Sequence, residues 1–151
     1  MNTNDKFKVV EAMLYNYKNT IAEIKILKRD LEILLNDYRG TGAISYEERT
    51  QSTNSFHSEV ESEVIKRAER IQKLKNKIRL KEIQIDNIDD AYESLFEDEQ
   101  LLLKERYFNK KTNKYVASIL SVTEQTSCDY KNKLINRLIP LLINSEESIQ
   151  N

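Results

Sequence analysis

Apolar side chains recur at steps of three and four residues along two long stretches of the chain. The first set is Phe7, Val10, Leu14, Tyr17, Ile21, Ile24, Leu31, Leu35 and Tyr38, with Lys28 in its one polar position. The second set is Val60, Val64, Ile71, Leu74, Ile78, Ile85, Ile88, Tyr92 and Leu95, with Arg67 and Lys81 in its polar positions. This spacing is typical of long helices that bury a narrow seam, as in coiled coils. Because the 151 residues include only two glycines and one proline, we expect an all-α protein.

These seams predict two long helices. The first is expected from Asp5 to Tyr38, with its N-cap within Thr3–Asp5. The polar stretch 39–57 is predicted to be a loop, and Ser58 with Glu61 forms a capping box that starts the second helix. The two helices can fold back as a hairpin or pair with another subunit, and the sequence leaves both open. Residues 1–95 are therefore assigned to a long helical hairpin for oligomerisation, including a homodimer, or for partner contact.

The character of the chain changes near 88–97, where we place a domain boundary. Residues 86–99 contain seven carboxylates and no basic residue. Residues 104–138 contain eight Lys or Arg against three Asp or Glu, a net charge of +5, although the whole chain has a net charge of −1. A basic module behind an acidic segment is a local signature of polyanion binding that the total charge conceals.

Residues 96–143 are predicted to form a small helix-turn-helix domain, followed by a polar tail at 144–151. We expect a helix from about Asp98 to Tyr107, a second from the N-cap Thr112 to Leu120, and a third that Thr123 caps and Pro140 ends or kinks. The turn is the three residues 121–123. The residues expected to face the interior are Leu101, Leu102, Tyr107 or Phe108, Val116, Ala117, Leu120, Val122, Tyr130, Leu134 and Leu138, with Ser127 in the stripe of the last three. A short helix with a small residue, a three-residue turn and a longer capped helix are typical of helix-turn-helix DNA-binding proteins.

The partner predicted from this pattern is double-stranded DNA. The exposed side chains expected to read bases from the last helix are Gln125, Thr126, Asp129, Asn132 and Lys133. Those expected at phosphates are Lys110, Lys111, Thr112, Lys114, Thr123, Lys131 and Arg137. A helical corner that binds a protein and never meets DNA would show the same helix pattern.

The run from Asp98 to Leu138, with ERYFNKK, VASILSVTEQT and KLINRL, resembles region four of the main sigma-factor family. It resembles more closely the phage late-transcription activators of the RinA and ArpU type. The resemblance implies a regulator that activates phage or prophage late genes for packaging and morphogenesis, with RNA polymerase as a partner. Early in the recognition helix, where those proteins often have a basic residue or Tyr, this chain has Ser127, Cys128 and Asp129. The resemblance therefore does not indicate which DNA sequence this chain would bind.

Other classes of site find little support in the sequence. Cys128 and His57 are the only residues of their types, so we expect no disulfide framework and no metal site. Gly40 and Gly42 lack the pattern of a phosphate loop, and we expect no catalytic residues, no cofactor and no enzyme activity. With no apolar run of membrane-spanning length, we expect a cytoplasmic protein, and the resemblance implies that the cell is a bacterial host. A DNA-packaging adaptor such as a small terminase subunit, and a helical interaction module without DNA binding, are the alternatives.

Overall fold

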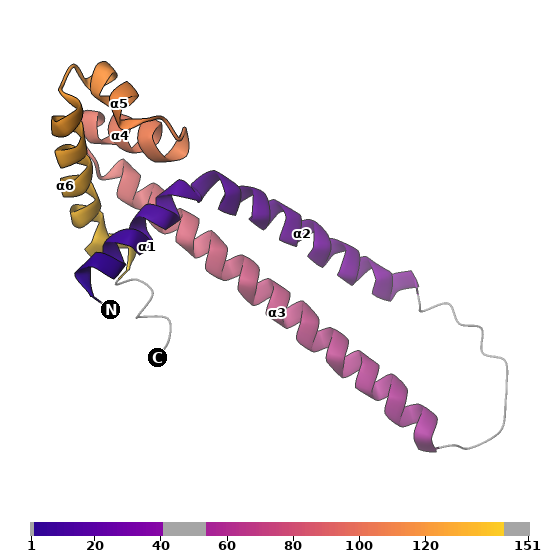
Figure 1. Cartoon of the computed structure of the whole chain (residues 1–151). Coiled ribbons are helices and arrows are strands. Elements are labelled where there is room, and N and C mark those ends of the chain that lie inside the picture. Colours follow the sequence, from indigo (N-terminus) through magenta and orange to yellow (C-terminus); the bar gives the residue numbers. More distant parts are fainter. Residues whose placement is uncertain (1, 41–53, 144–151) are drawn as a thin grey trace. The chain divides into compact units, whose positions relative to one another are not determined.

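The computed structural model describes residues 2–40 and 54–143, and the elements in these ranges are helices, with no strand among them. The elements are α1 (Thr3–Tyr15), α2 (Tyr17–Gly40), α3 (Asn54–Glu93), α4 (Glu97–Leu103), the π-helix η1 (Lys104–Phe108), α5 (Asn113–Leu120) and α6 (Glu124–Leu142) (Figure 1). The expected all-α class is confirmed for these residues. None of the described helices is both long enough and apolar enough to cross a membrane. The predicted tail 144–151 lies outside the described residues.

The described residues form two compact units. Unit 1 contains residues 2–22 and 82–143, and unit 2 contains residues 23–40 and 54–81. This grouping differs from the predicted boundary at 88–97, because α1 fills the same core as the C-terminal helices. The core of unit 1 consists of Val10, Met13, Leu14, Ile88, Ala91, Leu95, Leu102, Leu103, Tyr107, Val116, Leu134, Ile135, Leu138, Leu142 and Ile143. In Figure 1, α1 (indigo) lies against α6 (yellow-brown) within this unit.

The first predicted long helix is interrupted at Asn16. This residue has φ −93° and ψ 4°, and both its backbone N–H and its side-chain amide donate to the carbonyl of Ala12. An asparagine side chain competes with the backbone for such carbonyls, which is why it weakens helix interiors. The prediction of one helix from Asp5 to Tyr38 is therefore wrong. The N-cap position also differs, since Asn2 occupies it rather than a residue of the predicted range.

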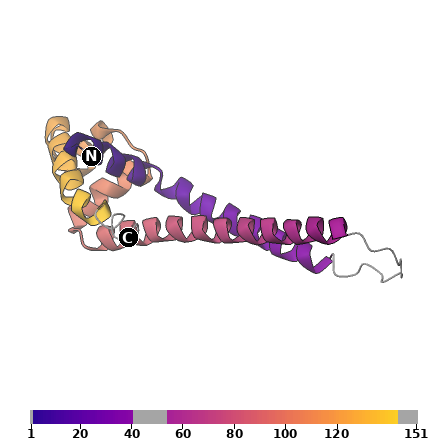
Figure 2. The same ribbon diagram turned by 90° about the horizontal axis from the view of Figure 1, so that it is seen from below.

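The second predicted helix begins earlier than expected. Helix α3 starts at Asn54 and is continuous to Glu93 (Figure 2), so Ser58 lies inside it and the predicted capping box is wrong. The remainder of the predicted loop, residues 41–53, lies outside the described residues. From Arg67 to Leu95 every predicted seam position is buried or half-buried, whereas Val60 and Val64 are about half exposed.

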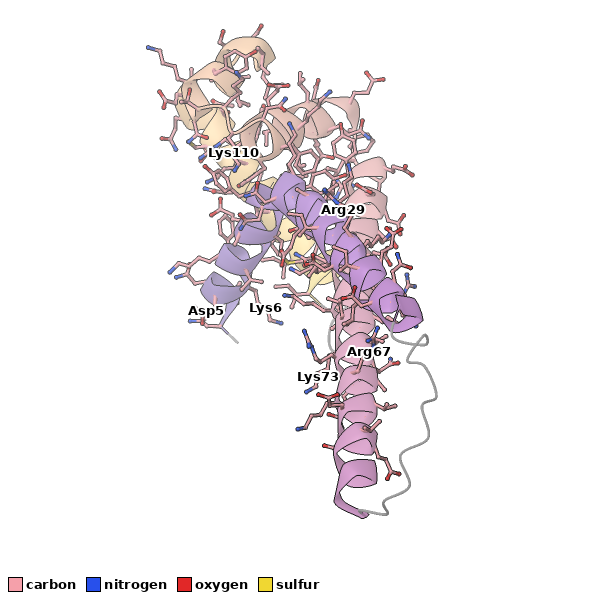
Figure 3. All side chains as sticks on the ribbon, turned by 90° about the vertical axis from the view of Figure 1, so that its right-hand side faces the viewer. Asp5, Lys6, Arg29, Arg67, Lys73 and Lys110 are labelled. Carbon is pink, nitrogen blue, oxygen red and sulfur yellow. The ribbon has the colours of Figure 1, made fainter. Side chains whose placement is uncertain are left out.

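The seam of α2 is displaced by one position at its far end. Leu34 is half-buried and Leu35 is 42% exposed, so the predicted seam residue is the wrong one of the pair. An α-helix has 3.6 residues per turn, so a strict 3.5-residue pattern drifts around its surface. Within unit 2, Arg67 donates from Nη2 to the Leu34 carbonyl, and Lys81 Nζ lies 2.8 Å from Glu23 Oε2. Figure 3 labels Arg29, Arg67 and Lys73 among the charged side chains of this unit.

The C-terminal helices follow the local signals in the sequence closely. Thr112 Oγ1 accepts from the Tyr115 N–H (3.2 Å), and Thr123 Oγ1 accepts from the Thr126 N–H (3.1 Å), so both predicted N-caps are confirmed. Helix α6 continues through Pro140 to Leu142, so of the two predicted effects of Pro140, an end or a kink, the end is wrong. Pro140 is exposed, and water can satisfy the helix carbonyl that its missing N–H leaves open.

Most residues predicted to face the interior of this region do so. Ser127, Leu102, Tyr107, Val116, Ala117, Leu134 and Leu138 are buried, and Phe108, Leu120 and Val122 are half-buried. Two predictions are wrong: Leu101 is 38% exposed and Tyr130 is 46% exposed. Leu103 faces the interior in place of Leu101 and is buried, as is Leu102. Tyr130 lies outside the buried stripe of α6, which passes through Ile135 instead.

Candidate nucleic-acid interface

Helices α5 and α6 are joined by the three residues Ser121, Val122 and Thr123. Ser121 has φ 56° and ψ 40°, the left-handed conformation that ends many helices, and the Val122 N–H donates to the Ala117 carbonyl (3.0 Å). Thr123 then caps α6. Ala117 is 4% exposed and places only a methyl group in the interior, which lets the two helices approach closely. Ser121 thus ends α5 and Thr123 starts α6, and the first residues of α6 lie at the surface.

The exposed side of α6 is a stripe of amide and charged side chains, here called the outer face. Its members are Gln125, Asp129, Asn132, Lys133 and Asn136, and all are exposed. Four of them follow steps of four, three and four residues, which places them on one side of a helix. The sequence-based prediction named all of these except Asn136. The signal that could have found it is its position four residues after Asn132.

Three of the predicted base-reading residues make contacts within α6 and its cap. Gln125 Nε2 donates to Asp129 Oδ1 (3.2 Å) across one helical turn, which gives that carboxylate a polar partner. The hydroxyls of Thr126 and Thr123 lie 2.7 Å apart, and Thr126 is half-buried. Within the described part of the chain, Asn132 and Lys133 make no such contact and project from the outer face. They are the members best placed to reach a ligand.

Three predicted phosphate-binding lysines gather at the start of α5. Lys110, Lys111 and Lys114 are all exposed and flank the cap residue Thr112, which is exposed too. Lys110 has φ 56°, and its ammonium lies 4.4 Å from the centre of the Tyr15 ring. The Lys111 ammonium lies 5.3 Å from the centre of the Tyr115 ring. Among the described residues no carboxylate pairs with Lys110 or Lys111, so aromatic faces hold these two cations at the surface without neutralising their charge.

Two further predicted phosphate contacts have carboxylate partners inside unit 1. Lys131 Nζ lies 3.2 Å from Glu11 Oε1, and the lysine side chain is only 18% exposed. Arg137 donates from Nη1 to both carboxylate oxygens of Glu99, at 2.8 and 2.9 Å. Both partners are far away in the sequence, so no local pattern could reveal these pairs. Lys131 and Arg137 contribute to the packing of α6 rather than to its outer face.

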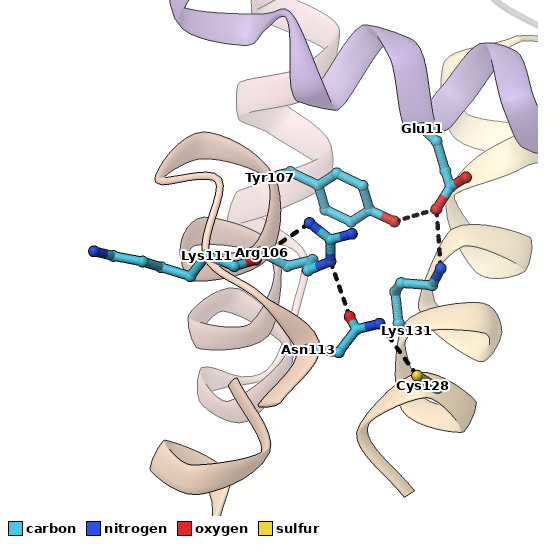
Figure 4. Close-up of polar contacts among 7 residues, drawn as sticks. All are labelled: Glu11, Arg106, Tyr107, Lys111, Asn113, Cys128 and Lys131. Carbon is cyan, nitrogen blue, oxygen red and sulfur yellow. Dashed lines mark hydrogen bonds and ion pairs between the residues drawn. The ribbon is translucent and has the colours of Figure 1, made fainter. Parts of the chain in front are cut away.

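A polar network connects α1, η1 and α6 behind the outer face (Figure 4). Glu11 Oε1 accepts from the Tyr107 hydroxyl (2.6 Å) and pairs with Lys131. Tyr107 is 3% exposed, and burial together with this hydrogen bond raises the pKa of Tyr107 above its usual value. The network joins the N-terminal helix to the helix that carries the outer face. Sequence reasoning missed it, because Glu11 looks like any charged residue on a helix surface.

A second group of contacts fixes the turn before α5. Arg106 donates from Nε to Asn113 Oδ1 (2.9 Å) and from Nη1 to the Lys111 carbonyl (3.2 Å). Asn113 Nδ2 in turn donates to Cys128 Sγ (3.2 Å) on α6. The lysine-bearing turn is therefore connected to the N-terminal part of α6 through Asn113 and Cys128 (Figure 4).

An open depression of about 490 Å³ borders the outer face. Its lining residues are Phe96, Asp98, Glu99, Leu102, Leu120, Val122, Tyr130, Lys133, Leu134 and Arg137. Tyr130 forms part of its wall, which accounts for the exposure of a residue predicted to be buried. Among the described residues, no group of three His, Cys, Asp or Glu side chains is placed to hold a metal ion. The side chain of His57 lies outside the described part of α3.

Comparisons with protein-family models, with curated protein sequences and with solved structures gave no match to this chain.

Proposed function

We propose that this protein binds double-stranded DNA sequence-specifically and regulates transcription, with α5, the turn and α6 acting as a helix-turn-helix. The observation that supports this most strongly is the outer face of α6, an exposed stripe of amide and charged side chains. Three exposed lysines at the start of α5, in the same unit, add positive charge. Amide side chains can pair with adenine through two hydrogen bonds in the major groove, which a helix of this size can enter. The total charge of −1 does not oppose this, because residues 104–138, which contain α5, the turn and most of α6, have eight Lys or Arg against three Asp or Glu.

The residues have different roles in this proposal. Asn132, Asn136 and Gln125 contact base edges, and Lys133 contacts a guanine or a nearby phosphate. Asp129 orients Gln125 through their hydrogen bond and can accept from a cytosine amino group. The lysines before and within the first turn of α5 bind phosphates and position the protein without reading sequence.

The test is selection of binding sites from a randomised duplex library. The wild-type protein should enrich a defined sequence, and the variant Asn132→Ala with Lys133→Ala should enrich none. The matched control is Lys75→Ala with Asn76→Ala, an adjacent exposed pair of the same residue types in unit 2. Circular dichroism should show equal helicity for all three proteins. Undiminished enrichment by the outer-face variant would rule out the assigned reading face.

The regulatory role rests on the resemblance to the phage late-transcription activators. In this proposal α2 and α3 form a hairpin that binds a second copy of the chain or RNA polymerase. Large apolar side chains that remain exposed on unit 2 support a partner there: Ile26, Ile33, Val60, Val64, Ile65 and Leu80 are 48–60% exposed. Activation is tested with a reporter gene under a promoter that carries the selected site.

The same apolar side chains would also suit a DNA-packaging adaptor, which needs to oligomerise. Measuring the mass in solution by light scattering separates the two roles. A monomer or dimer supports a regulator, whereas a closed ring of many copies supports packaging. If the wild-type protein binds no duplex even at low salt, where phosphate contacts are strongest, both DNA-binding roles are wrong and a protein-interaction module remains.

A further inference from the structure

The junction between α1 and α2 carries an exposed basic cluster that lies next to the turn before α5. Tyr15 and Lys18 are on the two sides of the break at Asn16, and both are exposed. The cluster also contains Lys110, which is labelled in Figure 3. These residues are more than ninety positions apart in the sequence, and the fold of unit 1 brings them together.

The turn is fastened to the junction by several contacts. Lys18 Nζ donates to Asn109 Oδ1 (2.9 Å), and Asn109 Nδ2 donates to Glu105 Oε1 (2.9 Å). Next to them the rings of Tyr17 and Phe108 are stacked with centroids 4.1 Å apart. The Lys110 ammonium lies over the Tyr15 ring at 4.4 Å. The junction and the turn therefore form one rigid surface that leads directly into the N-terminus of α5.

This surface has an excess of positive charge. Lys8 precedes Tyr15 by two helical turns on the same side of α1, and Lys111 follows Lys110 in the turn. Glu105 contacts the cluster through Asn109, and Glu11, which lies between Lys8 and Tyr15 on α1, is paired with Lys131. Helix α1, the junction and the turn thus carry four exposed lysines, and Tyr15 has a hydroxyl that can donate to a phosphate oxygen.

The backbone of Lys110 helps to fix this turn. Its φ of 56° is the left-handed conformation that ends many helices, and the Lys111 N–H donates to the Glu105 carbonyl of η1 (2.9 Å). A glycine there would remove the ammonium from its place over Tyr15.

We propose that this cluster is a second DNA-contacting surface, in which Lys8, Tyr15, Lys18 and Lys110 bind phosphates of the duplex flanking the site that α6 reads. The inference rests on the proposed DNA-binding function and extends it to the N-terminal helix. Phosphate contacts add affinity without sequence preference. The break at Asn16 then has a role, since it places Tyr15 and Lys18 around the same turn.

The alternative is that Lys18 only fastens the turn. Lys18→Gln separates the two roles, because glutamine keeps an amide donor for Asn109 and loses the charge. Lys18→Arg keeps the charge, and Lys75→Gln removes an exposed lysine from unit 2 as a matched control. Lys8→Gln is a second variant at an exposed position, and it can replace Lys18→Gln if that protein shows reduced helicity.

The experiment measures binding of each full-length protein to a fluorescent mixed-sequence DNA duplex over a range of salt concentrations. Each phosphate contact contributes about 0.9 to the slope of log affinity against log salt concentration. The ratio of the wild-type DNA affinity to that of Lys18→Gln should therefore fall about 3.5-fold between roughly 50 and 200 mM salt. Lys18→Arg and Lys75→Gln should behave like the wild-type protein.

Two other outcomes have distinct meanings. If Lys18→Gln keeps wild-type affinity and salt slope while Lys133→Ala binds more weakly, DNA binding stands and the second surface is wrong. If the wild-type protein binds no duplex at any salt concentration, the proposed function itself is wrong and the second surface falls with it.

Discussion

Replacing Leu14 with alanine tests the finding that the N-terminal helix belongs to the core of unit 1. Leu14 is 1% exposed and packs in the same cluster as Leu134, Leu138 and Leu142 of α6. Truncating so completely buried a leucine to alanine removes apolar contacts and leaves a cavity that the surroundings fill only in part.

The expected cost is about 2 to 5 kcal/mol of unfolding free energy. For a chain of this length that corresponds to a fall in melting temperature of about 2 to 4 °C for each kcal/mol. Leu35→Ala in unit 2 is the matched control, because Leu35 is 42% exposed. Its cost should stay near or below about 1 kcal/mol, since little apolar area leaves water at that position.

Urea unfolding followed by circular dichroism measures both variants against the wild-type protein. The midpoint should fall clearly for Leu14→Ala and little for Leu35→Ala, with similar slopes for all three proteins. Equal losses in the two variants would show that α1 is not part of the core of unit 1. The assignment of Glu11 to the network behind the outer face would then be wrong as well.

Three further predictions follow from single contacts. Tyr107→Phe removes the hydrogen bond to the Glu11 carboxylate and should cost about 1.5 to 3 kcal/mol in urea unfolding; a neutral result would contradict that bond. Thr123→Ala should cost about 0.5 to 2 kcal/mol, whereas Thr123→Ser should retain the cap, and equal losses would disprove its role. Burial and the bond to Asp89 raise the pKa of Tyr17 to about 12, so the unfolded state loses that proton at lower pH than the folded state. Stability should therefore fall as pH rises from about 10 towards 12, and less steeply in Tyr17→Phe, as thermal unfolding over that range would show.

Much of the candidate site could be predicted because its signals are local. The caps at Thr112 and Thr123 depend on a hydroxyl and an N–H three residues apart, so the sequence shows both partners at once. The exposed positions of Asn132 and Lys133 follow from helical periodicity once neighbouring buried positions such as Leu134 are known. The all-α class depends on the same periodicity and on the scarcity of glycine and proline.

The features that sequence reasoning missed depend on partners that are distant in the chain. A lysine on α6 has the same local pattern whether it faces DNA or a carboxylate, and only the packing of α1 shows that Lys131 pairs with Glu11. Tyr130 likewise fits the apolar spacing of α6, yet it lies at the edge of the buried stripe because α4 and α5 leave a depression there.

The sequence by itself therefore determined the all-α class, the caps of α5 and α6 and the composition of the outer face, because each depends on residues within one or two helical turns. Tertiary structure alone decided that α1 shares the core of α6, and which cations have internal partners. It also brought Tyr15 and Lys18 beside Lys110. Burial and charge pairing depend on which surfaces meet, and the residues that meet here are far apart in the sequence.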